Sequence, residues 1–145
     1  MNMNTKIFFS TLIALIMVGG FYLSTSASSA DAAESDDEIS VISVYMYADW
    51  CGSCQAIKPK MEEATRAFEG EPVLFTKMDM TDDFTAHQSK LMAYRLGLQE
   101  LFDENQGRTG FVMLVDANTL EVLDRITAAD ETEEIKQKIS ALLSR

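Results

Sequence analysis

The stretch DWCGSCQAIKP, residues 49–59, holds both cysteines of the chain, Cys51 and Cys54, with two residues between them. It follows an apolar and aromatic run and precedes a helical pattern. A disulfide that closes so small a loop constrains the unfolded chain very little, so a structural staple explains the pair poorly. Redox chemistry and metal binding remain as explanations, and the segments on either side bear on the choice.

The two flanking segments read as a strand and a helix. Residues 39–49, ISVISVYMYAD, are rich in β-branched and aromatic side chains and predict a strand buried on both faces of a sheet. Over residues 52–69 apolar or small side chains recur at intervals of four, four and three, which predicts a helix; they are Ile57, Met61, Ala64 and Phe68. Pro59 lies inside this pattern and should kink the helix, because it removes a backbone donor.

The rest of the chain continues the alternation of strands and helices. Residues 73–80, 109–116 and 120–127 predict three more strands, and residues 131–142 a final helix. Between the first two of these strands, Thr81 or Asp82 should cap a helix that runs on or restarts through residues 99–105. One side of that helix carries Phe84, His87 or Gln88, Leu91, Arg95 and Leu98.

This order predicts an α/β fold with a mixed sheet and helices on both of its faces. We expect parallel pairing where a helix joins two strands, and an antiparallel hairpin around the short turn at residues 117–119. The methionines of the strand and helix patterns are expected to pack in the core; examples are Met46, Met61, Met78, Met80 and Met113.

The N-terminal segment has the layout of a secretory leader. Lys6 precedes an uncharged run of 17 residues, 7–23, which is followed by small and polar residues with possible cleavage sites after Ala27, Ala30 or Ala32. An uncleaved membrane anchor is the alternative, since 17 residues is at the low edge of what spans a bilayer. Residues 1–30 thus predict export, to the periplasm or to a periplasm-facing membrane anchor.

An acidic linker should join this leader to the folded domain. Residues 31–38, DAAESDDE, hold five acids and no large apolar side chain, so they cannot bury enough surface to fold. The domain then covers residues 39–145, with 18 acidic against 11 basic side chains, a net charge of about −7. A nucleic-acid partner is not expected, because binding phosphates needs a basic face.

The position of the cysteines suits thiol chemistry. If the helix begins near Cys51, the helix dipole and the unpaired amides favour the thiolate there, and Cys54 lies one turn deeper on the same face. Cys51 would then attack a partner disulfide, and Cys54 would displace the mixed disulfide.

These residues resemble the thioredoxins. WCGSC is similar to the Trp-Cys-Gly-Pro-Cys motif of that family, with Ser53 where proline is usual, and Pro59 falls at the position of its helix-kinking proline. Lys77 in FTKMDM matches a family lysine, and the element order agrees over residues 39–145. The resemblance implies a thioredoxin-like three-layer fold, with a mixed sheet of about four strands flanked by helices. It also implies disulfide exchange with protein thiols and disulfides without a cofactor, and a place for Trp50 in a substrate groove.

Three departures from the family concern the surroundings of the dithiol. Tyr45 stands where thioredoxins have a buried acid, and it reads either as sheet packing or as a proton relay. The cis-proline that docks substrate in the family is missing at Thr109 or Gly110, where we expect a trans peptide. Residues 99–108 look like an insertion ending in Arg108, which could favour the Cys51 thiolate, contact an acidic partner or be solvated.

A metal-binding reading stays open beside the redox reading. His87, the only histidine, would complete a three-ligand set with the cysteines, as in thioredoxin-like copper chaperones, although those space their cysteines by three residues. No metal site is assigned. The sequence favours an exported thiol–disulfide oxidoreductase that acts as a reductase or relay, fed by a membrane or exported electron donor. A thioredoxin-like binding module with little turnover is the competing class.

Overall fold

The computed structural model describes residues 38–145. The expected leader, residues 1–30, and the linker up to residue 37 lie outside the described residues. Within residues 38–145, no helix combines the length and the apolar character needed to cross a membrane.

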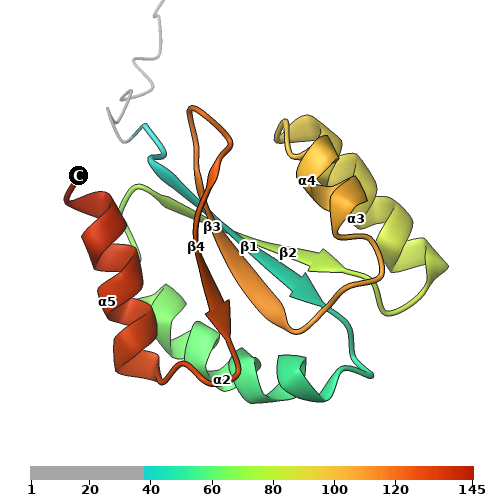
Figure 1. The fold of residues 1–145 in the computed structure, drawn as a ribbon, viewed down its shortest axis with the longest axis horizontal. Helices are drawn as coiled ribbons and strands as arrows, with labels where there is room; N and C mark the ends of the chain where they lie inside the picture. Colours follow the sequence, from blue (N-terminus) through green and yellow to red (C-terminus); the bar gives the residue numbers. More distant parts are fainter. Residues whose placement is uncertain (1–37) are drawn as a thin grey trace, which may run out of the picture. The chain divides into compact units, whose positions relative to one another are not determined.

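Four strands and four helices make up the described domain (Figure 1). In chain order they are β1 (Val41–Tyr47), α2 (Gly52–Ala67), β2 (Val73–Asp79), α3 (Asp83–Arg95), α4 (Gln99–Glu104), β3 (Phe111–Asp116), β4 (Val122–Thr127) and α5 (Thr132–Leu143). The sheet has the order β2-β1-β3-β4, with α2 and α5 on one face and α3 and α4 on the other. The predicted mixed sheet with helices on both faces is confirmed.

The direction of β3 differs from the prediction. β1 and β2 are parallel, as expected, and β3–β4 is the expected antiparallel hairpin, but β3 also runs antiparallel to β1. Our rule of parallel pairing across a helix fails there because the connection contains two helices. It leaves the sheet near Asp79, which pairs with Tyr47, and returns beside the same end of β1, where Phe111 pairs with Met46.

Strand β1 forms the centre of both hydrophobic layers. All seven of its residues are buried, as the continuous apolar run predicted. Val41, Tyr45 and Tyr47 pack toward α2 and α5, whereas Val44 and Met46 belong to the layer under α3 and α4. The five methionines expected in the core are all buried. The end of β1, which leads to the cysteines, is therefore fixed from both faces.

Helix α3 turns a different side to the sheet than its apolar residues suggested. Asp82 caps it, with a side chain that accepts from the amide of Thr85 at 2.8 Å. Its buried residues are Ser89 and Ala93, while Phe84 is 70% exposed and Leu91 is 54% exposed. The small side chains let the helix lie close to the sheet, and the Ser89 hydroxyl donates to the carbonyl oxygen of Asp79 at 2.9 Å.

Helix α4 is part of the core, although its segment looked like an insertion; the expected restart of the helix through residues 99–105 is confirmed. Phe102 is only 2% exposed and packs in the layer that contains Met46 and Met113. Asn105, also buried, donates its amide to the carbonyl oxygen of Leu101 at 2.8 Å and ends the helix. The segment therefore holds the approach to β3 in place.

Replacing Phe102 with alanine should reveal this contribution. Removing a buried aromatic ring leaves a cavity, so we expect Phe102→Ala to lower the free energy of unfolding by about 3–5 kcal/mol in urea titrations. Phe84→Ala is the matched control, because its ring is 70% exposed, and we expect a change within about 0.5 kcal/mol. Equal losses in the two variants would contradict the core role of α4.

Candidate functional site: a buried dithiol

The first cysteine caps the helix that carries the second. The Cys51 amide donates to the carbonyl oxygen of Ala48 at 3.2 Å, so the chain turns sharply after β1. Cys51 has extended backbone angles and is the N-cap of α2, and its sulfur accepts the amide of Cys54 at 3.2 Å. Cys51 is 9% exposed and Cys54 is fully buried. The thiol that can meet a partner is thus Cys51.

The pKa values of the two thiols are shifted in opposite directions. Burial alone would raise the pKa of Cys51, but hydrogen bonds from the side chains of Cys54 and Thr109 and from the amides of Cys54 and Ser53 outweigh it and lower that pKa. Burial raises the pKa of Cys54, and its hydrogen bond to Cys51 raises it further. The surroundings therefore favour the thiolate on Cys51 over the thiolate on Cys54.

Thr109 and Gly110 close the site from the direction of β3. Gly110 donates its amide to the carbonyl oxygen of Met46 at 2.9 Å and has a φ of +91°, in the region that favours glycine. A Cβ atom there would lie 2.8 Å from the Cβ of Ser53 and 3.2 Å from the sulfur of Cys51. All peptide bonds within residues 38–145 are trans, so the expected trans peptide at this position is confirmed.

Tyr45 reaches the dithiol from beneath. Its hydroxyl donates to the carbonyl oxygen of Cys54 at 2.6 Å, and its ring packs edge-on against Tyr47 with 5.4 Å between centroids. Burial, followed by the charges of Cys54 and Cys51, raises the pKa of Tyr45 far above its usual value. Tyr45 is thus a core residue that also holds the first turn of α2 as a neutral hydrogen-bond donor.

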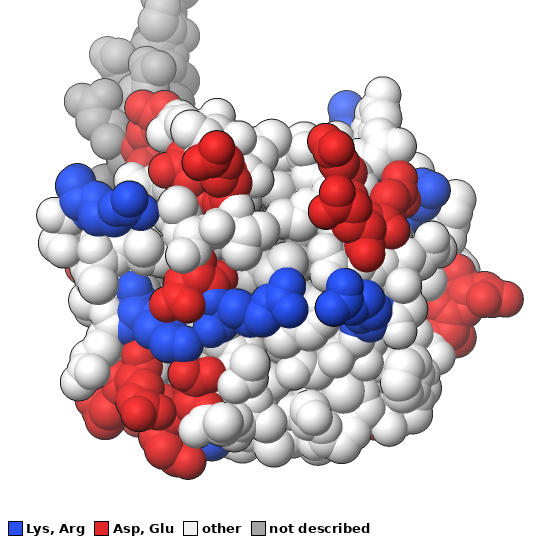
Figure 2. Space-filling model, viewed as in Figure 1, with Lys and Arg blue, Asp and Glu red and all other residues white. Residues whose placement is uncertain are grey.

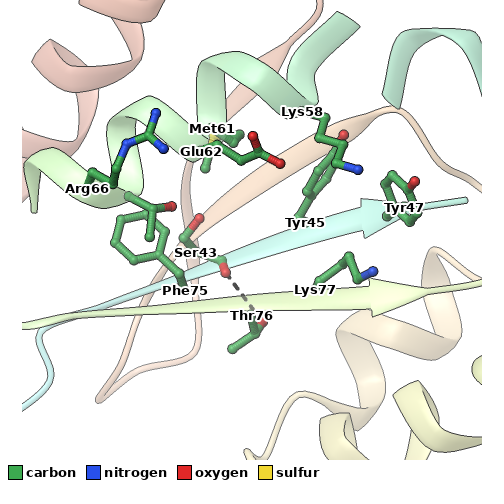
Figure 3. Close-up of a pocket in the computed structure, with 11 residues that line it drawn as sticks. Ser43, Tyr45, Tyr47, Lys58, Met61, Glu62, Arg66, Phe75, Thr76 and Lys77 are labelled. Carbon is green, nitrogen blue, oxygen red and sulfur yellow. Dashed lines mark hydrogen bonds between the residues drawn. The ribbon is translucent and has the colours of Figure 1, made fainter. Parts of the chain in front are cut away.

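Lys77 lies at the edge of the sheet and is held by other residues. Its ammonium forms an ion pair with Asp79 at 3.0 Å and sits 4.6 Å from the ring centroid of Tyr47. Figure 3 shows Lys77 beside Tyr47 along the groove between α2 and β2, with Tyr45 pointing up toward α2. The structure therefore places this predicted supporting lysine on a groove of about 440 Å³ and not among the hydrogen-bond partners of the thiols.

Trp50 stands beside Cys51 with its ring in solvent. It is 65% exposed, and its indole Nε1 donates to the carbonyl oxygen of Thr81 at 3.1 Å. The Thr81 hydroxyl accepts the amide of Asp49 at 3.0 Å. Thr81 thus anchors the segment before Cys51, a role that sequence reasoning missed. The only signal was its position in TDD after β2, which we read as a helix cap.

Neither Arg108 nor His87 is among the groups that shift the pKa values of the two thiols. The Arg108 side chain lines a cavity of about 550 Å³ between α4 and the β3–β4 hairpin, together with Arg125. The groups that lower the Cys51 pKa are hydrogen-bond donors of other residues, so this structure gives the proposed thiolate-favouring role of Arg108 no support. His87 is exposed on α3, and the described part of the chain holds no cluster of three or more potential metal ligands.

The comparisons with known proteins agree with this geometry. A family profile described as Thioredoxin matches residues 25–94. The chain thus has a thioredoxin-like fold, and its sequence resembles the thioredoxin family over these residues. A solved thiol:disulfide interchange protein of the thioredoxin family from Chlorobium tepidum shares its fold, with a TM-score of 0.52 at 15% identity over 74% of this chain and 83% of that one. The fold and the Cys51–Cys54 pair together support thiol–disulfide oxidoreductase chemistry.

A second solved structure, thioredoxin-2 of a malaria parasite, described as a component of its protein secretion machinery, has a TM-score of 0.48. It is 17% identical over 70% of this chain and 82% of that one. Among the curated proteins none matches the sequence of this thioredoxin-like protein.

Gly110→Ala should disturb the dithiol of this thioredoxin-like protein directly. The added methyl group would collide with Ser53 and Cys51, so we expect alkylation of Cys51 by iodoacetamide at pH 7 to change at least fivefold, with a loss of about 1–3 kcal/mol in the free energy of unfolding. Gly107→Ala is the control: it has a φ of +77° but nothing within 4 Å of a Cβ atom. An equal effect on alkylation in both variants would show that backbone strain, and not contact with the thiol, is responsible.

The pH dependence of Cys51 alkylation should report its lowered pKa. Only the thiolate reacts, so the alkylation rate of the folded, reduced protein should rise with pH along a titration curve. The midpoint of that curve should lie below the pKa of about 8.5 expected for a free cysteine. The same protein unfolded in urea should titrate near about 8.5. Mass spectrometry should place the label on Cys51. A folded midpoint at or above the unfolded one would contradict the lowered pKa.

Proposed function

We propose that the chain is an exported thiol–disulfide oxidoreductase, with Cys51 as nucleophile and Cys54 as resolving thiol. The observation that carries this proposal is the 3.2 Å hydrogen bond from the Cys54 amide to the Cys51 sulfur at the start of α2. It stabilises a thiolate on the more accessible cysteine and holds the second cysteine one turn away. A working dithiol needs both features.

Reduction of a substrate proceeds in two exchanges. The Cys51 thiolate attacks one sulfur of the substrate disulfide, a mixed disulfide forms, and the other substrate sulfur leaves as a thiolate. Cys54 then loses its proton and attacks the Cys51 sulfur, which releases the second substrate thiol and leaves a Cys51–Cys54 disulfide. Two electrons pass from the enzyme dithiol to the substrate, and a reductant must restore them.

We assign the reductase or relay direction and a place outside the cytosol. The leader pattern of residues 7–23 supports export to the periplasm, either cleaved or as an anchor, and an exported reductase needs a membrane or exported electron donor. The pKa of Cys51 is lowered and burial raises that of Cys54, which supports Cys51 as the thiol that starts the exchange.

Reduction of insulin disulfides with dithiothreitol as donor tests the activity. We expect Cys51→Ser to lose at least 100-fold in rate, because no nucleophile remains. Cys54→Ser should stop after one exchange and accumulate a mixed disulfide that is visible by mass spectrometry. A wild-type protein with no turnover above dithiothreitol alone would support the binding module instead.

The reduction potential of the Cys51–Cys54 pair tests the direction. A reductase or relay should equilibrate with dithiothreitol buffers at a potential below about −230 mV, near or under those of thioredoxin and of the glutathione pool. A value near −120 mV would mark an oxidant and overturn the assigned direction.

A further inference from the structure

Two arginines flank the segment that closes the dithiol. Arg108 directly precedes Thr109, and Arg125 stacks 4.3 Å from the ring centroid of Phe111, which directly follows Gly110. Two residues of chain span at most about 7 Å, and a Cβ on Gly110 would lie 3.2 Å from the Cys51 sulfur. The Arg108 backbone therefore lies within about 12 Å of the nucleophile.

Neither guanidinium group is neutralised by a neighbour. Lys60, Lys77, Lys90, Lys136 and Lys138 form ion pairs, but among residues 38–145 no carboxylate lies within 4.0 Å of Arg108 or Arg125. Glu100 and Glu104 line the same cavity from α4 without reaching either arginine. Both arginine side chains are exposed and free to meet an incoming anion.

The distribution of charge on the face shown in Figure 2 is consistent with two arginines that no carboxylate neutralises. Figure 2 shows basic side chains in a band across the middle of the face, over β4 and the segment that leads into β3. Acidic side chains lie above the band, at lower left and at the right edge, and some interrupt its left half; the surface below it, where α2 begins, is uncharged. The band is a local reversal of sign, because residues 39–145 carry 18 acids against 11 bases.

The backbone beside the arginines is open to a partner. Neither the amide nor the carbonyl oxygen of Thr109 has a hydrogen-bond partner within residues 38–145, whereas Arg108 donates to Asn105 and Gly110 to Met46. An extended segment that pairs with Thr109 would bring its side chains past both guanidinium groups. Guanidinium groups bind carboxylates through paired, charge-assisted hydrogen bonds.

We infer that the protein substrates of this dithiol carry acidic side chains next to the reactive disulfide, and that Arg108 and Arg125 select them. This inference rests on the proposed function. It runs against the net charge of about −7, which by itself would favour basic substrates. At an ionic strength of 0.15 M charges beyond about 8 Å are largely screened, so the local arginines dominate once the substrate is docked.

Two matched peptide disulfides test the inference on the full chain. Each is a homodimer joined by one disulfide, with glutamate or lysine at the two positions on either side of the cysteine. Single-turnover reduction by the dithiothreitol-reduced, desalted protein is followed by thiol release at 0.15 M salt. We expect the glutamate peptide to react about tenfold faster than the lysine peptide.

Charge-reversed variants assign the preference to the arginines. In Arg108→Glu/Arg125→Glu the preference should invert, and the single glutamine variants should each reduce it about threefold. Arg66→Gln, an exposed arginine on the α2–β2 groove, is the control and should leave the ratio unchanged. All variants should reduce uncharged 2-hydroxyethyl disulfide at the wild-type rate.

The outcomes separate the two hypotheses. An unchanged glutamate-to-lysine ratio in the doubly reversed variant, with normal reduction of 2-hydroxyethyl disulfide, would overturn the substrate preference and leave the oxidoreductase function standing. A wild-type preference for the lysine peptide would overturn it as well. Failure of the wild type to reduce any of the three disulfides would overturn the proposed function, and the preference with it.

Discussion

The hydrogen bond from the Cys54 amide to the Cys51 sulfur is the contact on which the site depends. A thiol is a weak acceptor and a thiolate a stronger one, so making Cys51 the helix cap couples its ionisation to the start of α2. That coupling requires a fixed position for the end of β1, which leads to Cys51. Burial of β1 on both faces fixes this position, because a shift of the strand by one residue would move every side chain to the opposite face of the sheet.

Tyr45 gives the buried side of the dithiol site a neutral hydroxyl group where thioredoxins have a carboxyl group. In the thioredoxin pattern a carboxyl group at this place could accept the proton of the resolving thiol, whereas a phenol whose pKa is raised by burial stays neutral. Its hydroxyl instead binds the Cys54 carbonyl, close to the helical turn in which Pro59 cannot donate an amide. Tyr45 thus supports the start of α2 through a hydrogen bond and does not accept a proton, so Cys54 must lose its proton by another route.

The sequence was informative where burial follows a simple period, and less so elsewhere. β1 could be predicted because every residue in it is apolar or small. The packed side of α3 could not, since Ser89 and Ala93 carry it and neither stands out in an apolar pattern. The proximity of Gly110 to Cys51 was suggested by family resemblance. The sequence could not predict that Arg108 lines the cavity beside α4, because its position in the chain does not determine the direction of its side chain.

Small residues replace the missing prolines around the dithiol. Where thioredoxins have proline between the cysteines and before the third sheet strand, this chain has Ser53 and the Thr109–Gly110 pair. These replacements depend on each other, because the backbone of Gly110 approaches Ser53 so closely that any Cβ atom would overlap it. A left-handed glycine thus brings the β3 segment against Cys51 by a trans peptide, and the hydroxyl of Thr109 becomes a donor to the thiolate. In this chain the closing segment therefore lowers the pKa of Cys51, and it leaves the backbone groups of Thr109 without a partner among the described residues.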